Sequence, residues 1–248
     1  MSGVRVEDRD DVRWIVFDRP EALNALTRAD LRDATRATVE APGRAIVYTG
    51  AGERAMCAGM HVESFQGLSP DQARALISEV GGFVGAARTS PLVTACAVDG
   101  YCLGAALELA MGCDLRVTTT RAVFGMPEIR VGIPSVVEAA LLQQYVGLAK
   151  AQEMLLTGDL WPVAELPGLA NTVVEPDRLG AATEELLAKV TRHSPAALAS
   201  QKRLFRTWQD FSLTESIARS IDEFAAVFAD PVTARHVDEH VARVRKRP

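Results

Sequence analysis

The alternation of short apolar runs with helix-like segments constrains the fold of this chain more than any other feature of its sequence. Runs rich in β-branched and aromatic residues, bounded by turn residues, are typical of strands. Segments with apolar residues three or four positions apart are typical of helices that bury one face. The predicted strands are residues 12–17, 44–49, 92–98 and 114–118, and the predicted helices between them are residues 27–40, 70–87 and 105–112. Strands that alternate with helices predict an α/β fold.

From about residue 136 the pattern is helical to the end of the chain. The predicted helices are residues 136–145, 150–156 and 178–191, followed by an amphipathic block at 195–244. We therefore expect two units, an α/β core over residues 1–194 and a C-terminal helical module over residues 195–248.

The composition fits a globular protein and excludes one class of partner. Of the 248 residues, 48% are hydrophobic and 24% are charged, so the chain can bury a core without disulfide support. The formal charge of −5 argues against nucleic-acid binding, which normally goes with a basic excess. The basic tail at 243–247 is the local exception, and such terminal runs are usually solvated. We expect no nucleic-acid partner.

The cysteines and the apolar stretches indicate a reducing, aqueous compartment. The four cysteines form no C-x-x-C pair, and several stand among apolar residues, which predicts buried free thiols. They are Cys57, Cys96, Cys102 and Cys113. The first residues are charged and lack the apolar region of a signal peptide. Apolar stretches are broken well short of a membrane span, so we expect a cytoplasmic protein without membrane contact.

One glycine motif has the spacing of a dinucleotide-binding loop. Residues 50–55, Gly-Ala-Gly-Glu-Arg-Ala, follow a predicted strand. The dinucleotide fingerprint also needs a helix that opens at the motif and an acidic residue ending a second strand about 20 residues later. Here a second glycine turn follows at 57–59, and the acidic residue near that distance, Asp71, begins a helix. A nicotinamide-dependent oxidoreductase is therefore disfavoured.

A glycine turn that opens an apolar helix is the best candidate for a catalytic element. Gly100 and Gly104 precede the predicted helix 105–112, so free backbone N–H groups and the positive end of the helix dipole lie at this turn. Glu108 stands one turn into the helix among Ala, Leu and Met. Such surroundings raise the pKa of a carboxyl group, as a general acid near neutral pH requires. On this segment alone, a Glu108 that faces solvent is equally plausible, and Glu128 is undistinguished by itself.

Taken together, three collinear segments resemble the enoyl-CoA hydratase/isomerase (crotonase) superfamily. Residues 97–109 are similar to the family's A-x-N-G-x-A-L-G-G-G-x-E-L, and residues 124–128, Phe-Gly-Met-Pro-Glu, to its F-x-x-P-E. Residues 19–26 are similar to its R-P-x-A-L-N-A-L entry to the CoA site. The resemblance implies a crotonase-like ββα superhelix core. It also implies a helical module for oligomerisation and CoA-site cover, in a homotrimer or a dimer of trimers.

The same resemblance implies a role for each site residue. Glu108 and Glu128 are the implied acid/base pair for syn addition of water to a trans-2-enoyl-CoA. The implied oxyanion hole consists of the backbone N–H groups of Met60 and Ala105. The implied substrate contacts are Ala22, Leu23, Ala58, Gly59, Gly104 and Ser135, the last through a backbone N–H that steadies the water. We expect no metal site and no bound cofactor, because coenzyme A enters as part of the acyl-CoA substrate.

The chain departs from the family pattern on either side of this site. Residues 132–138, Gly-Ile-Pro-Ser-Val-Val-Glu, replace a glycine-rich stretch and add a third carboxylate. That carboxylate, Glu138, could be a third catalytic group or a solvated helix residue, and we favour the solvated helix residue. Met60-His61 replaces a common Ala-Asp, so the acyl pocket is expected to be narrower, and we interpret His61 as a loop residue without a role.

These departures leave other functions open. On the same fold the chain could catalyse Δ3-Δ2 isomerisation or thioester hydrolysis, or it could bind acyl-CoA without catalysis. The presence of both glutamates argues against a silent protein, because nothing else favours an ionisable side chain on an apolar helix.

Overall fold

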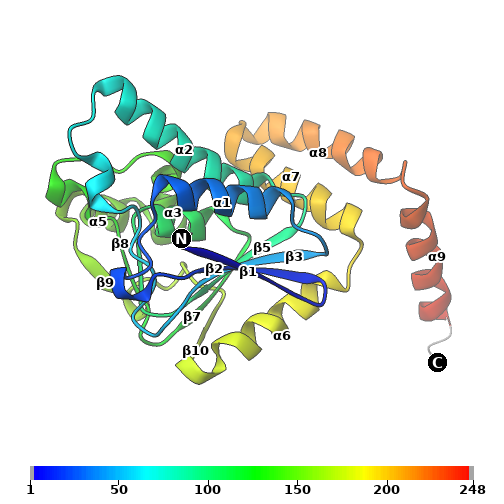
Figure 1. The fold of residues 1–248 in the computed structure, drawn as a ribbon. Helices are drawn as coiled ribbons and strands as arrows, with labels where there is room; N and C mark the ends of the chain where they lie inside the picture. Colours follow the sequence, from blue (N-terminus) through cyan, green and yellow to red (C-terminus); the bar gives the residue numbers. More distant parts are fainter. Residues whose placement is uncertain (1–2, 246–248) are drawn as a thin grey trace.

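The computed structural model describes residues 3–245 and shows two sheets flanked by helices, with an all-helical arm at one end (Figure 1). The strands are β1 (Val4–Arg9), β2 (Val12–Phe17), β3 (Ala45–Gly50), β4 (Ala55–Cys57), β5 (Val93–Val98), β6 (Tyr101–Leu103), β7 (Leu115–Thr119), β8 (Val123–Gly125), β9 (Leu160–Pro162) and β10 (Thr172–Val174). The α-helices are α1 (Arg28–Val39), α2 (Pro70–Thr89), α3 (Ala105–Gly112), α4 (Leu142–Val146), α5 (Leu148–Thr157), α6 (Leu179–Thr191), α7 (Pro195–Asp210), α8 (Leu213–Val227) and α9 (Pro231–Arg245). The 3-10 helices are η1 (Pro20–Ala22), η2 (Val62–Phe65), η3 (Pro127–Val131), η4 (Val137–Leu141), η5 (Val163–Glu165) and η6 (Pro176–Arg178).

The larger sheet is covered by helices on both faces. Its order is β1-β2-β3-β5-β7-β10, with β1 and β2 antiparallel and the other neighbours parallel. Ile15 and Phe17 of β2 pack into the core that includes Phe83 of α2, whereas Trp14 and Val16 face the opposite side with Leu187 of α6. This alternation follows from the two-residue period of a strand. It places α1, α2 and α3 on one face of the sheet and α6 on the other (Figure 1).

The smaller sheet positions the start of α3. Its order is β4-β6-β8-β9, with β8 and β9 antiparallel and the other neighbours parallel. β6 runs directly into Gly104 and α3, and β8 ends two residues before η3. The three-residue strands therefore bring the first turn of α3 and the η3 segment to the same edge of the sheet.

The structure confirms the predicted α/β alternation. β2 and α3 have the predicted bounds, and β3, β5, β7, α1 and α2 match their predictions within two residues. At the start of α1, the Thr27 hydroxyl accepts from Asp30 N–H and the Asp30 carboxylate accepts from Thr27 N–H. This capping box satisfies two backbone donors that the helix start would otherwise leave unpaired. Residues 50–55 lead into β4 rather than a helix, which agrees with our rejection of a dinucleotide loop.

One helical prediction was wrong in detail. The segment predicted as one helix at 136–145 is the 3-10 helix η4 followed by the short α4, and it begins with Val137 at a φ of 53°. A left-handed β-branched residue interrupts regular helix geometry. The predicted helical block at 195–244 is confirmed and consists of α7, α8 and α9, because Ser212 caps a new helix and Asp230-Pro231 begins another. The strands β1, β4, β6, β8, β9 and β10 were not predicted.

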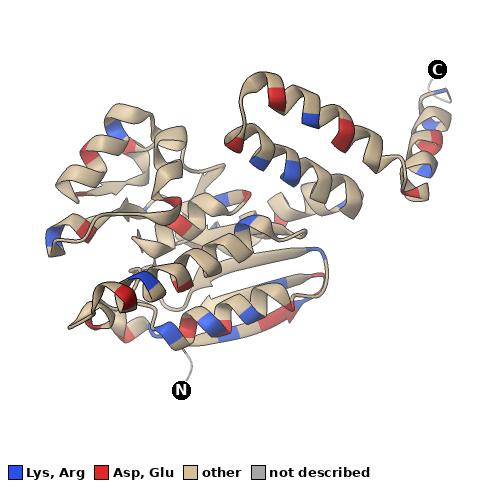
Figure 2. Cartoon of the chain, turned by 90° about the horizontal axis from the view of Figure 1, so that it is seen from above, with Lys and Arg blue, Asp and Glu red and all other residues tan. Residues whose placement is uncertain are grey.

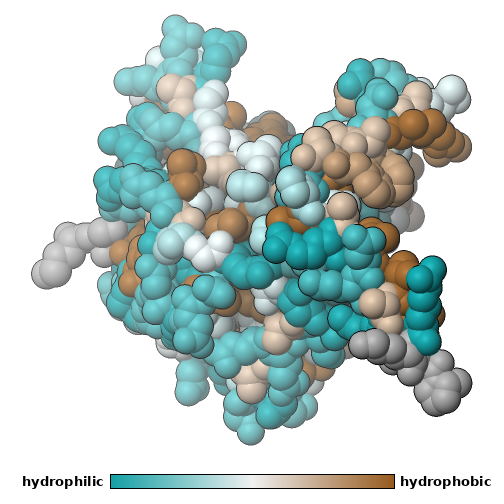
Figure 3. All heavy atoms as spheres, turned by 90° about the vertical axis from the view of Figure 1, so that its right-hand side faces the viewer, coloured by the Kyte–Doolittle hydropathy of each residue, from teal (hydrophilic) through white to brown (hydrophobic). Residues whose placement is uncertain are grey.

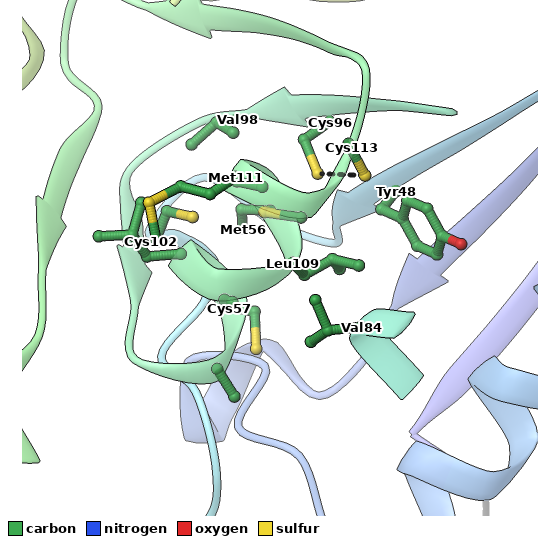
Figure 4. Close-up of a cluster of buried hydrophobic side chains, with 14 of the residues drawn as sticks. Tyr48, Met56, Cys57, Val84, Cys96, Val98, Cys102, Leu109, Met111 and Cys113 are labelled. Atoms are coloured by element: carbon green, nitrogen blue, oxygen red, sulfur yellow. Dashed lines mark hydrogen bonds between the residues drawn. The ribbon is translucent and has the colours of Figure 1, made fainter. Parts of the chain in front are cut away.

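The core beneath α3 is rich in sulfur (Figure 4). All four cysteines are buried free thiols, as predicted. Cys96 of β5 and Cys113 at the end of α3 point toward one another, with 3.6 Å between their sulfur atoms. Met56 and Met111 lie in the same cluster. Burial raises the pKa of the Cys57 thiol to about 12, so it stays protonated at neutral pH.

The C-terminal helices extend away from the sheets. Lys202 of α7 is 6% exposed, and it donates to the backbone oxygen of Leu92 and pairs with Asp114 at 2.6 Å, which ties α7 to the core. α8 packs on α7, whereas α9 lies at the far end of the molecule (Figures 1 and 2). In the described residues, no helix is both long and apolar enough to cross a lipid bilayer. The predicted basic tail lies partly outside the described residues, which end at Arg245.

Candidate active site

A cavity of about 350 Å³ lies at the N-terminal end of α3. Its walls come from the turn after β4, from η2, from one face of α2, and from the segment that follows η3. The apolar side chains in the wall are Met60, Val62, Phe65, Ile77, Val80, Val131, Ile133 and Val136. The polar lining is limited to Glu108, Glu128, Arg130 and Ser135. An apolar cavity with a few convergent polar groups is the usual form of a small-molecule site.

Gly104 allows Glu128 to approach the start of α3. Gly104 is the N-cap of α3 and has a φ of 53°, a conformation that L side chains rarely adopt. A Cβ atom at this position would lie 2.4 Å from Glu128 Oε1. The absence of a side chain at Gly104 therefore makes room for the carboxylate at the first turn of the helix.

Replacing Gly104 by alanine is expected to displace the Glu128 carboxylate and to destabilise the protein. This sparsely populated backbone conformation costs about 1–3 kcal/mol for a residue with a Cβ, and the contact with Glu128 adds to that strain. Thermal unfolding should show a lower Tm. Substrate turnover should fall by more than the loss of folded protein explains. Gly147→Ala is the control, because Gly147 also combines a positive φ (79°) with a ψ outside the left-handed helical region (156°), but a Cβ there would meet no atom within 4 Å. If the two variants lose Tm and turnover to the same extent, the space that Gly104 leaves for the Glu128 carboxylate is not important for the reaction.

Met60 and Ala105, whose backbone N–H groups are the predicted oxyanion hole, both line this cavity. Leu26 and Met60 form a parallel β-bridge. Its two hydrogen bonds run from Leu26 N–H to Gly59 O and from His61 N–H to Leu26 O, so they involve the residues before and after Met60 and not the N–H of Met60 itself. Because adjacent peptide groups of an extended strand point to opposite sides, the Met60 N–H points away from Leu26. Ala105 is the first residue of α3, so its N–H has no partner inside the helix. Gly59 brings the two segments together, since a Cβ there would lie 3.4 Å from Ala105 N.

Glu108 is the more deeply buried of the two cavity glutamates. It is 5% exposed, and its Oε2 has no hydrogen-bond partner among the described residues. Burial, followed by the charges of Glu128 and Glu138, raises the pKa of Glu108 to about 8. At neutral pH the side chain is therefore mostly a neutral acid, as its apolar setting in the sequence predicted.

Glu128 lies in the first turn of η3 and has one fixed partner. The Ser135 hydroxyl donates to Glu128 Oε2 at 2.9 Å. Burial raises the pKa of Glu128, and hydrogen bonds from its own backbone and from Ser135 work against that rise. Sequence analysis predicted a role for the Ser135 backbone, but the hydroxyl contact was missed because the loop geometry is not encoded in the family pattern.

The interpretation of Glu138 as a solvated helix residue was wrong. Glu138 is partly buried at the start of η4, and its Oε2 is inaccessible to solvent and has no hydrogen-bond partner among residues 3–245. Burial raises the pKa of Glu138, and Arg88 of α2 opposes that rise. The error arose because the predicted continuous helix would have exposed this position, whereas the turn at Val137 directs the chain inward.

The other predicted substrate contacts lie beside the cavity. Ala22 ends η1, and Leu23 O accepts a hydrogen bond from Ala58 N–H at 2.9 Å. Asn24 anchors this loop, because its side-chain amide donates to Ala51 O and Ala55 O. Ala58, Gly59, Gly104 and Ser135 line the cavity, whereas Ala22 and Leu23 do not. His61 does not line the cavity either, and its Nδ1 lies 3.9 Å from Glu63.

A family model described as enoyl-CoA hydratase/isomerase matches residues 7–242. The chain belongs to the enoyl-CoA hydratase/isomerase family. The match covers nearly the whole chain and confirms the crotonase resemblance that the collinear motifs indicated. The chain is thereby an enoyl-CoA hydratase-like enzyme, in the hydro-lyase class.

Individual relatives agree with this membership of the enoyl-CoA hydratase/isomerase family. A short-chain-enoyl-CoA hydratase from Clostridium acetobutylicum is 27% identical, over 100% of this chain and 96% of that protein. An enoyl-CoA hydratase structure from Mycobacterium smegmatis superposes with a TM-score of 0.91 and 26% identity, over 98% of this chain and 97% of the other. A Thermobifida fusca structure, described as a candidate enoyl-CoA hydratase in complex with CoA, has a TM-score of 0.80 and 26% identity, over 92% and 93% of the two chains. These superpositions confirm the predicted crotonase-like fold with C-terminal helices.

Proposed function

We propose that the protein is an enoyl-CoA hydratase that adds water across the double bond of a trans-2-enoyl-CoA. The observation that carries this proposal is that Glu108 and Glu128 line one cavity, beside the N-terminal end of α3. A single carboxylate is enough to move a proton between two carbons, whereas addition of water needs one group to accept a proton and another to donate one. The hydratase names of the relatives in this family support the same reaction.

The Met60 and Ala105 N–H groups form the oxyanion hole in this proposal. As water attacks C3, negative charge develops on the thioester oxygen, and two preorganised backbone donors stabilise that charge. One donor of this kind is typically worth about 3–4 kcal/mol of activation free energy. The start of α3 adds the favourable end of the helix dipole.

The two glutamates share the proton transfers of the syn addition. One takes a proton from the attacking water, and the other delivers a proton to C2 on the same face of the double bond. Since each charge raises the energy of ionising the other, the two carboxyl groups titrate as a coupled pair. Ser135 lies beside Glu128, where its backbone N–H steadies the water.

Coenzyme A enters as part of the substrate in this proposal. The CoA-bound relative from Thermobifida fusca supports an acyl-CoA ligand. The contacts proposed for the CoA portion are the backbone near Ala22, Leu23 and Ala58, next to the cavity. The apolar wall from Met60 to Val136 suits a hydrocarbon acyl group.

We also propose that the protein assembles as a homotrimer or a dimer of trimers in the cytoplasm. The C-terminal helices expose large apolar side chains that an assembly would cover: Phe205, Trp208, Phe211, Leu213, Ile217, Ile221, Phe224 and Phe228. A hollow of about 550 Å³ lies along this face of α8. Figure 3 looks onto this end of the molecule and shows hydrophobic side chains gathered on its right-hand side. Sedimentation velocity measures the mass, and a monomer at micromolar concentration would contradict the assembly.

The hydratase function is tested by the loss of enoyl-thioester absorbance with crotonyl-CoA and longer 2-enoyl-CoAs. The wild type is expected to form the 3-hydroxyacyl-CoA, and Glu128→Gln is expected to lose about 10²-fold or more in kcat/KM. Chromatography of the products separates the alternatives, because hydrolysis releases free CoA and isomerisation consumes a 3-enoyl-CoA without adding water. A wild type that leaves every 2-enoyl-CoA unchanged would overturn the hydratase proposal.

A further inference from the structure

We propose that Met60 is a specificity-determining residue whose side chain excludes a methyl branch at C2 or C3 of the acyl group, so that the enzyme acts on unbranched 2-enoyl-CoAs. The inference rests on the hydratase function proposed above and names the substrate class of the same site. It concerns the side chain of Met60, whereas the proposed oxyanion hole uses only the backbone N–H. Met60 stands where the family commonly has an alanine.

The backbone around Met60 is held by its neighbours in the chain fold. Leu26 N–H donates to Gly59 O at 2.8 Å, and His61 N–H donates to Leu26 O at 2.8 Å. Gly59 also lies directly against β6, because a Cβ at this glycine would be 2.8 Å from the backbone oxygen of Leu103. The segment cannot shift to admit a wider ligand without loss of these contacts, so the space beside it is set by the Met60 side chain.

The side chain of Met60 lines the cavity, at the proposed position of the thioester. The nitrogen of a hydrogen-bond donor lies about 2.9 Å from the oxygen that it contacts. Because Cβ is two bonds from that nitrogen, the Met60 side chain begins next to the thioester carbonyl in the proposed complex. The carbon atoms C2 and C3 follow the thioester carbon directly, and the unbranched methionine side chain is long enough to lie alongside both.

The rest of the cavity leaves little room for a branch near the thioester. Large apolar side chains of η2, α2 and the segment after η3 form most of the wall. The volume of about 350 Å³ equals the share of about a dozen water molecules in the liquid, at about 30 Å³ each. Part of it must hold the thioester and the adjoining end of CoA. An unbranched chain can extend along such a cavity, whereas a methyl branch needs extra width where the thioester is held.

The packing of Met60 keeps its side chain in this place. Methionine is flexible and rearranges readily in loose surroundings. Met60, however, is partly buried and packs against the main hydrophobic core. A close-packed core offers little free volume into which the side chain could move when a ligand binds. We therefore expect Met60 to exclude a branched acyl group rather than to yield to it.

The kinetic test compares crotonyl-CoA with tiglyl-CoA and 3-methylcrotonyl-CoA, which carry a methyl group at C2 and at C3. Met60→Ala should raise the ratio of kcat/KM for a branched substrate to that for crotonyl-CoA by about 10–200-fold, the usual effect of one carbon in an apolar pocket. Met60→Leu conserves the side-chain volume and should change the ratio much less. All three substrates use the same backbone donors, so an effect on the oxyanion hole cancels in the ratio.

Val62→Ala is the matched control for loss of apolar wall. Val62 also lines the cavity with an apolar side chain, but it lies on η2 and is 58% exposed. Its replacement should change the ratio much less than Met60→Ala does. An equal rise in both variants would show that any enlargement of the cavity admits the branch, and the specific role of Met60 would be overturned. A wild type that hydrates branched substrates as well as crotonyl-CoA would overturn it directly.

Binding of saturated acyl-CoAs separates this proposal from the hydratase proposal. Isothermal titration calorimetry compares butyryl-CoA with isobutyryl-CoA and valeryl-CoA with isovaleryl-CoA, because the two members of each pair have the same number of carbon atoms. The wild type should bind the unbranched member more tightly, and Met60→Ala should reduce that preference by about tenfold or more, whether or not the protein hydrates enoyl-CoA. A reduced preference in a protein without hydratase activity would overturn only the proposed reaction. Hydration of crotonyl-CoA with an unchanged preference in Met60→Ala would overturn only the role of Met60.

Discussion

Replacing Glu108 by glutamine is expected to lower kcat/KM for enoyl-CoA hydration by at least about 10²-fold. Glutamine keeps the size of the side chain but cannot deliver a proton. In the proposed reaction each of the two cavity glutamates carries one proton transfer, so the loss of Glu108 leaves one transfer without a group. The proposed oxyanion hole is made of backbone groups, so substrate binding should survive, and KM should change much less than kcat.

The control for this variant is Glu165→Gln. Glu165 is an exposed residue of η5 outside the cavity, so this change tests the loss of a carboxylate alone. Stopped-flow absorbance with crotonyl-CoA measures both constants, and circular dichroism checks the fold. A Glu108→Gln enzyme that retains most of its kcat would remove Glu108 from the proton transfer.

The stability of the unliganded protein is expected to fall steeply between pH 4.5 and pH 8 because of Glu108. Its pKa rises from an ordinary value of 4.5 to about 8 on folding, so the folded state binds more protons than the unfolded state in this interval. Where the folded state binds more protons, stability decreases as pH rises. The stabilisation is complete below pH 4.5 and is lost as the pH passes through about 8, a change of about 5 kcal/mol in the free energy of unfolding.

Urea denaturation at fixed protein concentration between pH 5 and pH 9 measures this effect. Glu108→Gln cannot ionise, so its free energy of unfolding should vary much less across the range, and the two proteins should differ most at high pH, in favour of the variant. The remaining slope should come from Glu128 and Glu138, whose pKa values are also raised by burial. A wild type and a Glu108→Gln variant with parallel stability curves would show that Glu108 is ionised in the fold at neutral pH.

The elements with strong local signals were predictable from the sequence. α3 combines an apolar pattern with a glycine turn before it, and α1 combines an apolar face with a capping box. The three-residue strands β4, β6 and β8 were missed, because three residues cannot establish a period of two. Their positions depend on pairing between segments about 20 to 45 residues apart in sequence, as between Ala55 and Tyr101.

Fewer features of the site could be predicted from the residues that surround each position in the sequence than from the family resemblance. The apolar surroundings of Glu108 indicated a neutral acid, and the structure gives the same answer. The placement of Glu128, Met60 and Ala105 around one cavity came from the family motifs, since no local pattern joins these residues. The Ser135 hydroxyl contact and the burial of Glu138 could not be predicted, because both depend on the path of an irregular segment that contains two positive-φ residues, Gly132 and Val137.

Local unfolding of the sulfur-rich core beneath α3 can be measured by the reactivity of the protein's own cysteines. All four cysteines are buried around the helix that carries Glu108, and no exposed cysteine competes with them for a reagent. A thiol reagent in excess can therefore react only after this part of the core opens, so the labelling rate gives the free energy of that opening. Mass spectrometry of the labelled chain would show which sulfur is exposed first. The mobility of α3 can thus be followed in the native sequence, without an introduced probe.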